Sequence, residues 1–290
     1  MTMQNYIIIT DTGCDIAPET LKQWEIPAES LTFKFDGDDK EYFNSDMDTK
    51  TFYEKMRKGG VAKTSAVNME RFRVLFERTL KEGKDILYLG FSGGLSTTYN
   101  SARIAANDLK DEYPDRKIIV VDTLCASAGL GLIVYLTMQK KNEGATIEEA
   151  AEYATGLIPN MDHWVTVDDL VYLKRGGRIS PTLAFVGNTL GLKPVIHVDN
   201  EGKLVSVEKI RGRKNAIAFL ADTYEKLALD KKNGTVFISH ADCEEDAKQL
   251  IKILSDKYGA TVTVLTDIGP VIGAHAGPGT IALFFVGKER

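Results

Sequence analysis

Short apolar runs alternate with helix-like patterns through the first half of the chain. Residues 6–10, 86–90 and 118–121 are rich in β-branched and other apolar side chains, which predicts buried strands. Between residues 99 and 109, apolar side chains recur at steps of three and four, which is typical of an amphipathic helix. Strands that alternate with helices predict βαβ units, and therefore a parallel sheet covered on both faces.

Several helix starts are marked by their first residues. Pro18 suits the first position of a helix that reaches about residue 24. Ser127 precedes an apolar helix that ends near Gly144, and Thr146 with Glu149 has the spacing of a capping box. These signals place helices between and after the predicted strands.

The pattern changes after Pro159. Two strand-like runs flank the turn residues 199–202, which predicts a hairpin. A short helix is expected from Asp168, and Ser180 followed by Pro181 predicts a helix to about residue 191. Further strands are expected at 164–167, 236–239, 262–265 and 281–286, and further helices at 214–229 and 244–258.

A hairpin inside this alternation predicts a mixed sheet. We therefore expect an α/β protein with two α/β domains, residues 1–160 with a parallel sheet and residues 161–290 with a mixed sheet.

Composition narrows the function classes. The 290 residues are 43% hydrophobic and carry a net charge of −5, so a basic nucleic-acid footprint is not expected. No stretch approaches the roughly 20 apolar residues of a membrane span, and no signal-like segment opens the chain. The three cysteines are widely spaced, which favours a reducing compartment over disulfides or a zinc site. We expect a cytoplasmic protein without metal, cofactor or integral membrane association.

The most informative motif is the stretch 269–280. It holds His275 together with four glycines and two prolines, and an apolar run follows it. Glycines let a backbone approach a ligand and prolines stiffen it, so we expect a loop whose imidazole donates to an anionic oxygen. The alternative is a tight connection between strands with an incidental histidine.

Two polar segments are candidate anion sites. Ser92, Gly93, Gly94 and Ser96 lie between a predicted strand and helix, where free backbone N–H groups can face a carboxylate or phosphate. An ordinary helix cap by Ser96 is an equally good interpretation. Thr64 and Ser65 offer two hydroxyls between two helical patterns, but such residues before a helix are usually caps.

Positive charge is concentrated between residues 174 and 214, although the whole chain is acidic. Either a solvated face, a partner-docking surface or a phosphate site explains this asymmetry. Arg178, after two glycines, is the best candidate for a specific role. No Walker A loop is present, and the string Gly277-x-Gly279 leads into a strand-like run, so no nucleotide site is expected.

Taken together, the segments resemble the bacterial DegV family over nearly the whole chain. The matching strings are Thr10-Asp11-Thr12, Thr64-Ser65, the segment 92–99, Tyr172 to Ile179, Lys193-Pro194-Val195, and Gly269 to Gly279. Two positions depart from the family pattern: Gly93 stands for a second serine, and Thr97 stands for a glycine.

The resemblance implies a fatty-acid-binding subunit of a fatty acid kinase. It implies two α/β domains, with a long acyl tail buried in the first domain. It implies that the carboxylate is held by Thr64, Ser65, Ser92, Gly93, Gly94, Ser96 and His275. It further implies a carrier without a catalytic centre, which presents the fatty acid to a separate ATP-dependent kinase subunit for acyl-phosphate formation and phospholipid metabolism. Arg175, Arg178 and Arg211 would form the docking face for that kinase.

Two other functions stay open. His275 could capture a small carbonyl metabolite covalently, as in the substrate subunit of dihydroxyacetone kinase, or the protein could be a lipid-sensing regulator. A triose site needs a small polar pocket, whereas a fatty-acid carrier needs a long apolar one. Acyl chain length, oligomeric state and partner identity are not predicted from the sequence.

Overall fold

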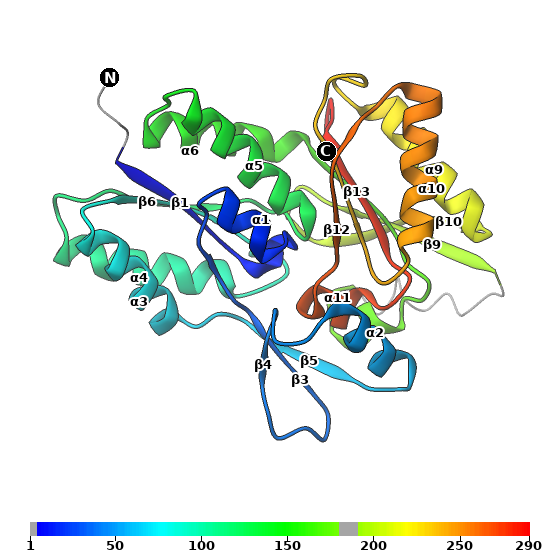
Figure 1. Ribbon diagram of the computed structural model, residues 1–290, viewed down its shortest axis with the longest axis horizontal. Coiled ribbons are helices and arrows are strands. Elements are labelled where there is room, and N and C mark those ends of the chain that lie inside the picture. Colours follow the sequence, from blue (N-terminus) through cyan, green and yellow to red (C-terminus); the bar gives the residue numbers. More distant parts are fainter. Residues whose placement is uncertain (1–4, 180–190) are drawn as a thin grey trace.

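Figure 1 shows the computed structural model, which describes residues 5–179 and 191–290. The helix expected from Ser180 to about residue 191 therefore lies outside the described residues. Among the described residues, no helix has both the length and the apolar character needed to cross a membrane.

The first sheet is parallel throughout, as predicted. Its strands β1 (Tyr6–Asp11), β2 (Ala28–Glu29), β6 (Asp85–Gly90) and β7 (Ile118–Asp122) lie in the order β2-β1-β6-β7. Their side chains alternate between two cores. Ile9 and Tyr88 pack with α3 (Met69–Lys81) and α4 (Thr98–Glu112). Ile8 and Leu89 pack on the other face, against α1 (Pro18–Gln23), α5 (Ala128–Asn142) and α6 (Ile147–Leu157).

The second sheet is mixed, which confirms the predicted fold class. Its order is β10-β9-β8-β13-β11-β12, and only β11 and β12 are parallel neighbours. The helices α9 (Arg213–Leu227) and α10 (Glu244–Tyr258) share a core with it. The strands are β8 (Met161–Thr166), β9 (Leu192–Val198), β10 (Leu204–Arg211), β11 (Val236–His240), β12 (Val262–Asp267) and β13 (Ile281–Val286).

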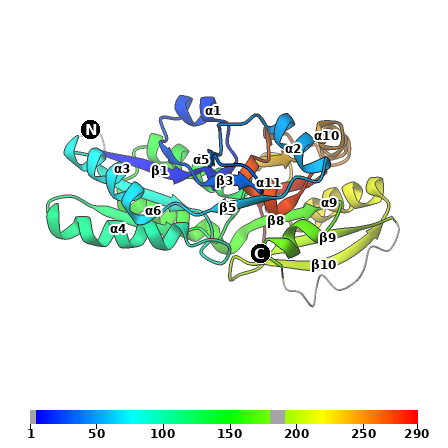
Figure 2. The ribbon, with the colours of Figure 1, turned by 90° about the horizontal axis from the view of Figure 1, so that it is seen from below.

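Helix α5 joins the two parts of the molecule. Its residues pack in one core with the first sheet and with Phe237 and Phe284 of the second sheet. Such burial on several sides explains why residues 128–138 of this helix carry no charged side chain, whereas its last turn is polar. Figure 2 shows the two parts side by side along the long axis, and the 3-10 helix η2 (Ile158–Asn160) links α6 to β8.

A third, small antiparallel sheet was not predicted. It contains β3 (Thr32–Phe35), β4 (Tyr42–Phe43) and β5 (Ala62–Ser65), and α2 (Thr49–Arg57) packs on it. The cap interpretation of Thr64 and Ser65 is wrong, because both lie in β5 and Asn68 caps α3 through the N–H of Arg71. Strand β3 alternates polar residues with Phe33 and Phe35, but β4 has two residues and β5 is polar, so neither partner strand shows an apolar alternation in the sequence.

The stretch around His275 also differs from the expected loop. Residues Pro270–Ala276 form a short helix, α11, with Pro270 in its first turn. Proline fits there because the first turn does not use its missing N–H. Gly277 then ends the helix with φ 81°. His275 is therefore held on helical backbone, next to the helix end.

Candidate functional site

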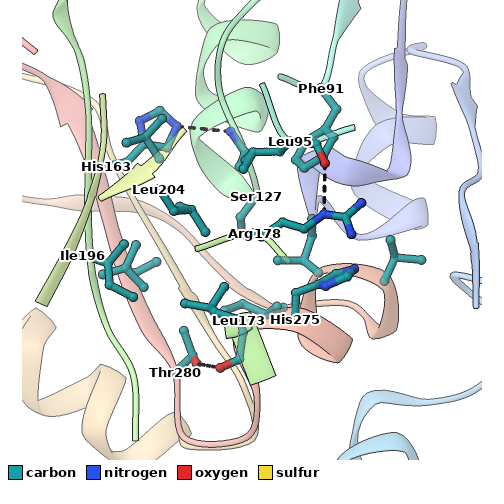
Figure 3. Close-up of a pocket in the computed structure, with 18 of the residues that line it drawn as sticks. Phe91, Leu95, Ser127, His163, Leu173, Arg178, Ile196, Leu204, His275 and Thr280 are labelled. Carbon is teal, nitrogen blue, oxygen red and sulfur yellow. Dashed lines mark hydrogen bonds between the residues drawn. The ribbon is translucent and has the colours of Figure 1, made fainter. Parts of the chain in front are cut away.

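An apolar cavity of about 100 Å³ lies between the two sheets. Side chains from β8, β9, β10, β13 and α11 form much of its wall, and the first sheet contributes loop residues (Figure 3). The larger apolar members include Phe91, Leu95, Leu173, Ile196, Leu204 and Phe284. The cavity is thus built between the two parts, with most of its lining from the second part rather than inside the first.

His275 forms the centre of a polar cluster at one side of this cavity. Its Nε2 lies 2.8 Å from Oγ1 of Thr64, which joins α11 to β5. Its Nδ1 is buried and has no hydrogen-bond partner among the described residues. Burial, and then the nearby charge of Arg178, lower the pKa of His275 to about 4. The imidazole is therefore neutral at neutral pH, with one donor and one acceptor nitrogen.

Arg178 is the cation of this cluster. It is half-buried and lines the cavity; its Nε donates to the carbonyl of Leu95 (3.1 Å) and its Nη1 to that of Gly176 (2.6 Å). No carboxylate of the described residues lies within ion-pair distance of it. Burial lowers the pKa of Arg178, but an arginine keeps its charge at neutral pH. The site therefore offers an uncompensated positive charge to an anionic ligand.

Gly176 allows this arrangement because it has no side chain. A Cβ at this position would lie 2.0 Å from Nδ1 of His275. The residue also ends α7 (Val171–Arg175), which carries the chain toward Arg178. Sequence reasoning missed this role, although the glycine pair before Arg178 was a visible signal.

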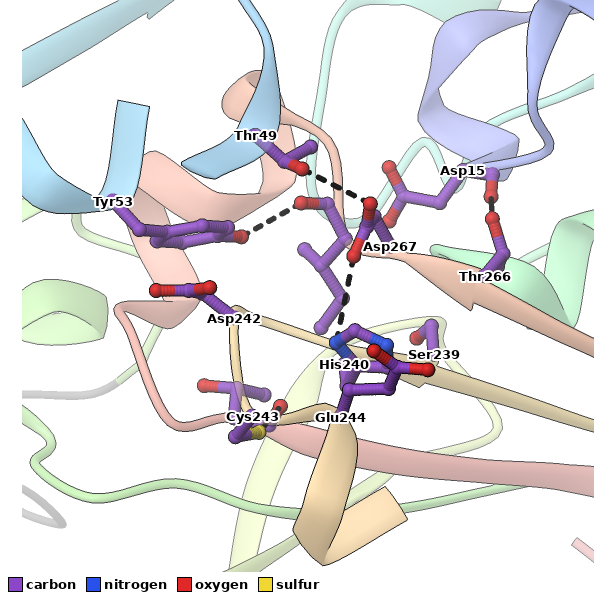
Figure 4. A network of polar contacts seen from close by, with 12 residues as sticks. Asp15, Thr49, Tyr53, Ser239, His240, Asp242, Cys243, Glu244, Thr266 and Asp267 are labelled. Atoms are coloured by element: carbon purple, nitrogen blue, oxygen red, sulfur yellow. Dashed lines mark hydrogen bonds and ion pairs between the residues drawn. The ribbon is translucent and has the colours of Figure 1, made fainter. Parts of the chain in front are cut away.

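A network of polar contacts fixes the start of α11 (Figure 4). The buried carboxyl of Asp15 accepts from the N–H of Gly269 (2.9 Å), and Tyr53 donates to the carbonyl of Ile268 (2.7 Å). Thr266 donates to the carbonyl of Asp15 (2.8 Å). These contacts join the 3-10 helix η1 (Thr12–Cys14), which Asp15 ends, to α2 and β12, so segments far apart in the sequence position the helix that carries His275.

The predicted head-group residues divide into two sets. Thr64, Ser96 and His275 line the cavity. Ser65 points to the other face of β5, where it is exposed and bonds Glu41. The structure therefore brings one hydroxyl of the Thr64–Ser65 pair to the cavity.

The residues 92–94 bond to the chain itself. The N–H of Gly93 donates to the carboxylate of Asp122 (3.0 Å), and the N–H of Gly94 donates to Oγ of Ser92 (3.1 Å). Ser92 in turn donates to the carbonyl of Gly202 (2.8 Å). None of the three lines the cavity, so the expected free amides are occupied in this structure.

The remaining polar lining is internally satisfied. Figure 3 shows His163 across the cavity from His275. His163 accepts from the N–H of Ala126 (3.3 Å) and bonds the carbonyl of Met161 (3.0 Å), and burial holds its pKa well below the usual value. Ser127 donates to Asp15 (2.6 Å). The cavity thus has one polar side with unused hydrogen-bonding capacity.

The other two residues of the expected docking face lie away from the cavity lining. Arg175 is exposed at the end of α7, with its guanidinium 5.7 Å from the ring centre of Tyr172. Arg211 is exposed at the end of β10. In the described part of the chain, no group of three or more metal-binding side chains is present.

Comparisons with known proteins agree with the observed fold. The model of the DegV family matches residues 5–288. A DegV domain-containing protein of Clostridium perfringens is 40% identical over 289 residues, which are 99% of this chain and 99% of that protein. A crystal structure of a DegV lipid-binding protein from Thermotoga maritima has a TM-score of 0.86 and 29% identity, covering 99% of each chain. A DegV family protein from Thermus thermophilus, described as binding fatty acid, has a TM-score of 0.88 and 27% identity over 98% of this chain and 99% of that one.

Proposed function

Since this chain belongs to the DegV family, we propose that it binds a long-chain fatty acid in the cavity between its two sheets. The observation that carries the proposal is an apolar cavity with unused polar groups at one side only. Solved relatives of the same fold include proteins described as lipid-binding and fatty-acid-binding.

The carboxylate is held by the cluster around His275. Thr64 and Ser96 supply hydroxyls, His275 supplies a neutral imidazole, and Arg178 supplies the charge. Hydrogen bonds to a charged group contribute about 1.5–3 kcal/mol each. Ser92, Gly93 and Gly94 lie outside the lining and bond the chain itself, so we do not assign them to the carboxylate.

The acyl tail fills the apolar remainder. Each buried CH₂ contributes roughly 0.8 kcal/mol, so a long tail supplies most of the affinity. His163 and Ser127 are satisfied by the protein, so this part of the wall offers no partner to a polar substituent on the tail.

The protein acts as a carrier without a catalytic centre of its own. It presents the carboxylate to a separate ATP-dependent fatty acid kinase subunit, which makes the acyl phosphate. The sequence has no Walker A motif, which supports this division of labour. Residues 1–160 and 161–290 serve as its two domains, and its three cysteines are free thiols, which supports a cytoplasmic location.

Arg175 and Arg211 are the docking residues for the kinase. Both are exposed, whereas Arg178 bonds backbone carbonyls in the cavity wall. We therefore assign Arg178 to the head group rather than to docking.

Covalent capture of a small carbonyl compound by His275 is the alternative function. It calls for a small polar pocket, and the mainly apolar lining supports the carrier instead. Replacing His275 with alanine distinguishes the two: a carrier loses part of its affinity, and a covalent binder loses all of it.

The first test is to denature purified protein, extract it with organic solvent and identify the released molecule by mass spectrometry. A long-chain fatty acid near one per chain supports the carrier. No lipid, together with a mass adduct at His275 on intact protein, supports the covalent binder. A His275→Ala variant that binds lipid as tightly as wild type contradicts the head-group assignment.

A further inference from the structure

If the protein binds a long acyl chain, as proposed above, one wall of the cavity must move to admit it. This inference rests on that proposed function. The volume of the cavity is about 100 Å³. An apolar cavity of roughly 150 Å³ accommodates benzene, which has six carbons. A long-chain fatty acid has several times as many heavy atoms, so part of the described wall must separate on binding.

The hairpin of β9 and β10 forms one of these walls. It contributes Ile196, Val198 and Leu204 to the lining. Strand β10 lies at the edge of the second sheet and pairs with β9 alone. Displacement of this hairpin therefore opens the cavity and breaks no pairing beyond β8 and β9.

One side-chain hydrogen bond holds the tip of this hairpin, residues 199–203, against the first part of the molecule. Ser92 donates it from Oγ to the carbonyl of Gly202 (2.8 Å), and it is the single bond of its kind between the tip and the described residues outside the hairpin. A Cβ on Gly202 would lie 2.2 Å from this Oγ, and a Cβ on Gly94 would lie 2.6 Å from the carbonyl oxygen of Glu201. The tip thus closes at a distance that only glycines permit.

The backbone beneath the tip is strained. Leu124 and Ser127 both have φ of 52°, a region that favours glycine. Such residues persist where their surroundings hold them. Gly202 packs on Leu124: a Cβ added to Gly202 would lie 3.0 Å from the Cβ of Leu124. Ala126 and Ser127, in the same segment, line the cavity. The closed tip therefore covers a strained section of the cavity wall.

Arg290 joins these elements next to the tip of the hairpin. It donates to the carbonyl of Val198 (3.3 Å) in β9 and to that of Leu124 in the strained segment. The hairpin and the segment 124–127 are therefore linked, so movement of one is transmitted to the other.

We propose that the β9–β10 hairpin is the gate of the cavity and that the Ser92–Gly202 hydrogen bond is its latch. The ligand enters and leaves when the tip lifts from residues 92–94 and the segment 124–127 relaxes. The latch is one hydrogen bond, so its loss should accelerate opening by about 2- to 10-fold.

The test compares Gly202→Ala with Gly259→Ala. Gly202 has φ +72° and a clash with the latch, whereas Gly259 has φ +68° and nothing within 4 Å of its Cβ position. Both variants carry the same backbone penalty, but only the first pushes the tip away. Stopped-flow binding of cis-parinaric acid should show association and dissociation rates that both rise by about 2- to 10-fold in Gly202→Ala alone. Equal rates in the two variants overturn the gate.

Ser92→Ala is a milder second variant that keeps the tip's backbone. A latch role predicts that both rates rise together with little change in affinity. If only dissociation accelerates and affinity falls, Ser92 contacts the ligand and is not the latch.

Hydrogen exchange separates the gate from the proposed function. Without any ligand, the amides of β10 should exchange faster in Gly202→Ala than in Gly259→Ala, while those of β13 stay unchanged. If the wild-type protein does not bind cis-parinaric acid, the proposed fatty-acid function is contradicted. If the β10 amides exchange at the same rate in Gly202→Ala and Gly259→Ala, the gate is contradicted, whichever ligand the cavity binds.

Discussion

Replacing Gly176 with alanine should weaken fatty-acid binding by displacing His275. The added Cβ would lie 2.0 Å from Nδ1, 2.8 Å from Cε1 and 3.2 Å from Cγ of the ring. Gly176 has φ −75° and ψ −9°, which any residue adopts, so backbone strain makes no contribution. The effect therefore comes from displacement of the His275 imidazole.

The size of the effect follows from these distances. Relief of the contact moves the ring by about 1 Å or more, since atoms rarely approach within ~3.4 Å. The present distance of 2.8 Å between His275 and Thr64 then exceeds hydrogen-bonding range. Loss of a hydrogen bond to a carboxylate costs about 1.5–3 kcal/mol, which is roughly a 10- to 150-fold rise in Kd.

Fluorescence displacement of cis-parinaric acid by an unlabelled fatty acid measures this rise. Gly177→Ala is the matched control, because Gly177 has φ +69° but nothing within 4 Å of its Cβ position. It should lose some stability and keep its affinity. The decisive measurement is a double-mutant cycle with His275→Ala. In that background Gly176→Ala should have almost no further effect, and a full additional loss would refute the reasoning.

Three further predictions address charge, docking and pH. Arg178→Gln should raise the Kd for a fatty acid by about 10-fold or more in the same displacement assay, because it removes the one cation of the cluster; unchanged affinity would place the carboxylate elsewhere. Arg211→Glu should lower acyl-phosphate formation by the kinase several-fold in a coupled assay and leave lipid binding intact, since the residue is exposed and outside the cavity lining. If the variant and the wild type support the same rate of acyl-phosphate formation, Arg211 is not part of the docking face. Burial raises the pKa of Asp15 from 3.8 to about 8, so the native state keeps a proton that the unfolded state releases. The free energy of unfolding should therefore fall as the pH rises from 3.8 to about 8, by up to about 1.4 kcal/mol per pH unit. Asp15→Asn should reduce this slope in urea titrations at several pH values; the same slope in both proteins would contradict the assignment.

Most of the fold was predictable because its elements are strongly patterned. The capping box of Thr146 and Glu149 is present, and the helix predicted at 244–258 has those bounds in α10. The hairpin signal at 199–202 forms the antiparallel pair of β9 and β10. In these cases local chemistry and tertiary packing favour the same structure.

The unpredicted elements are those in which tertiary packing decides. Strand β5 is polar and four residues long, and it exists because β3 supplies its partner thirty residues earlier. Helix α11 (Pro270–Ala276) has a proline in its first turn and one interior glycine, Gly273, so local propensity does not favour it. It is held at its start by Asp15, which accepts from the N–H of Gly269, and by Tyr53, which donates to the carbonyl of Ile268.

Residue types and their order along the chain were enough to indicate an α/β protein, a candidate anion-binding region around His275 and the resemblance to one family. Local periodicity and capping residues encode helices and strands, and short family motifs can be recognised directly in the sequence. Only the tertiary structure decided that Arg178 faces the cavity, that Ser92 bonds Gly202, and that Gly176 leaves room for His275. Each of these depends on a contact between residues from separate elements, where fractions of an ångström distinguish a hydrogen bond from a clash.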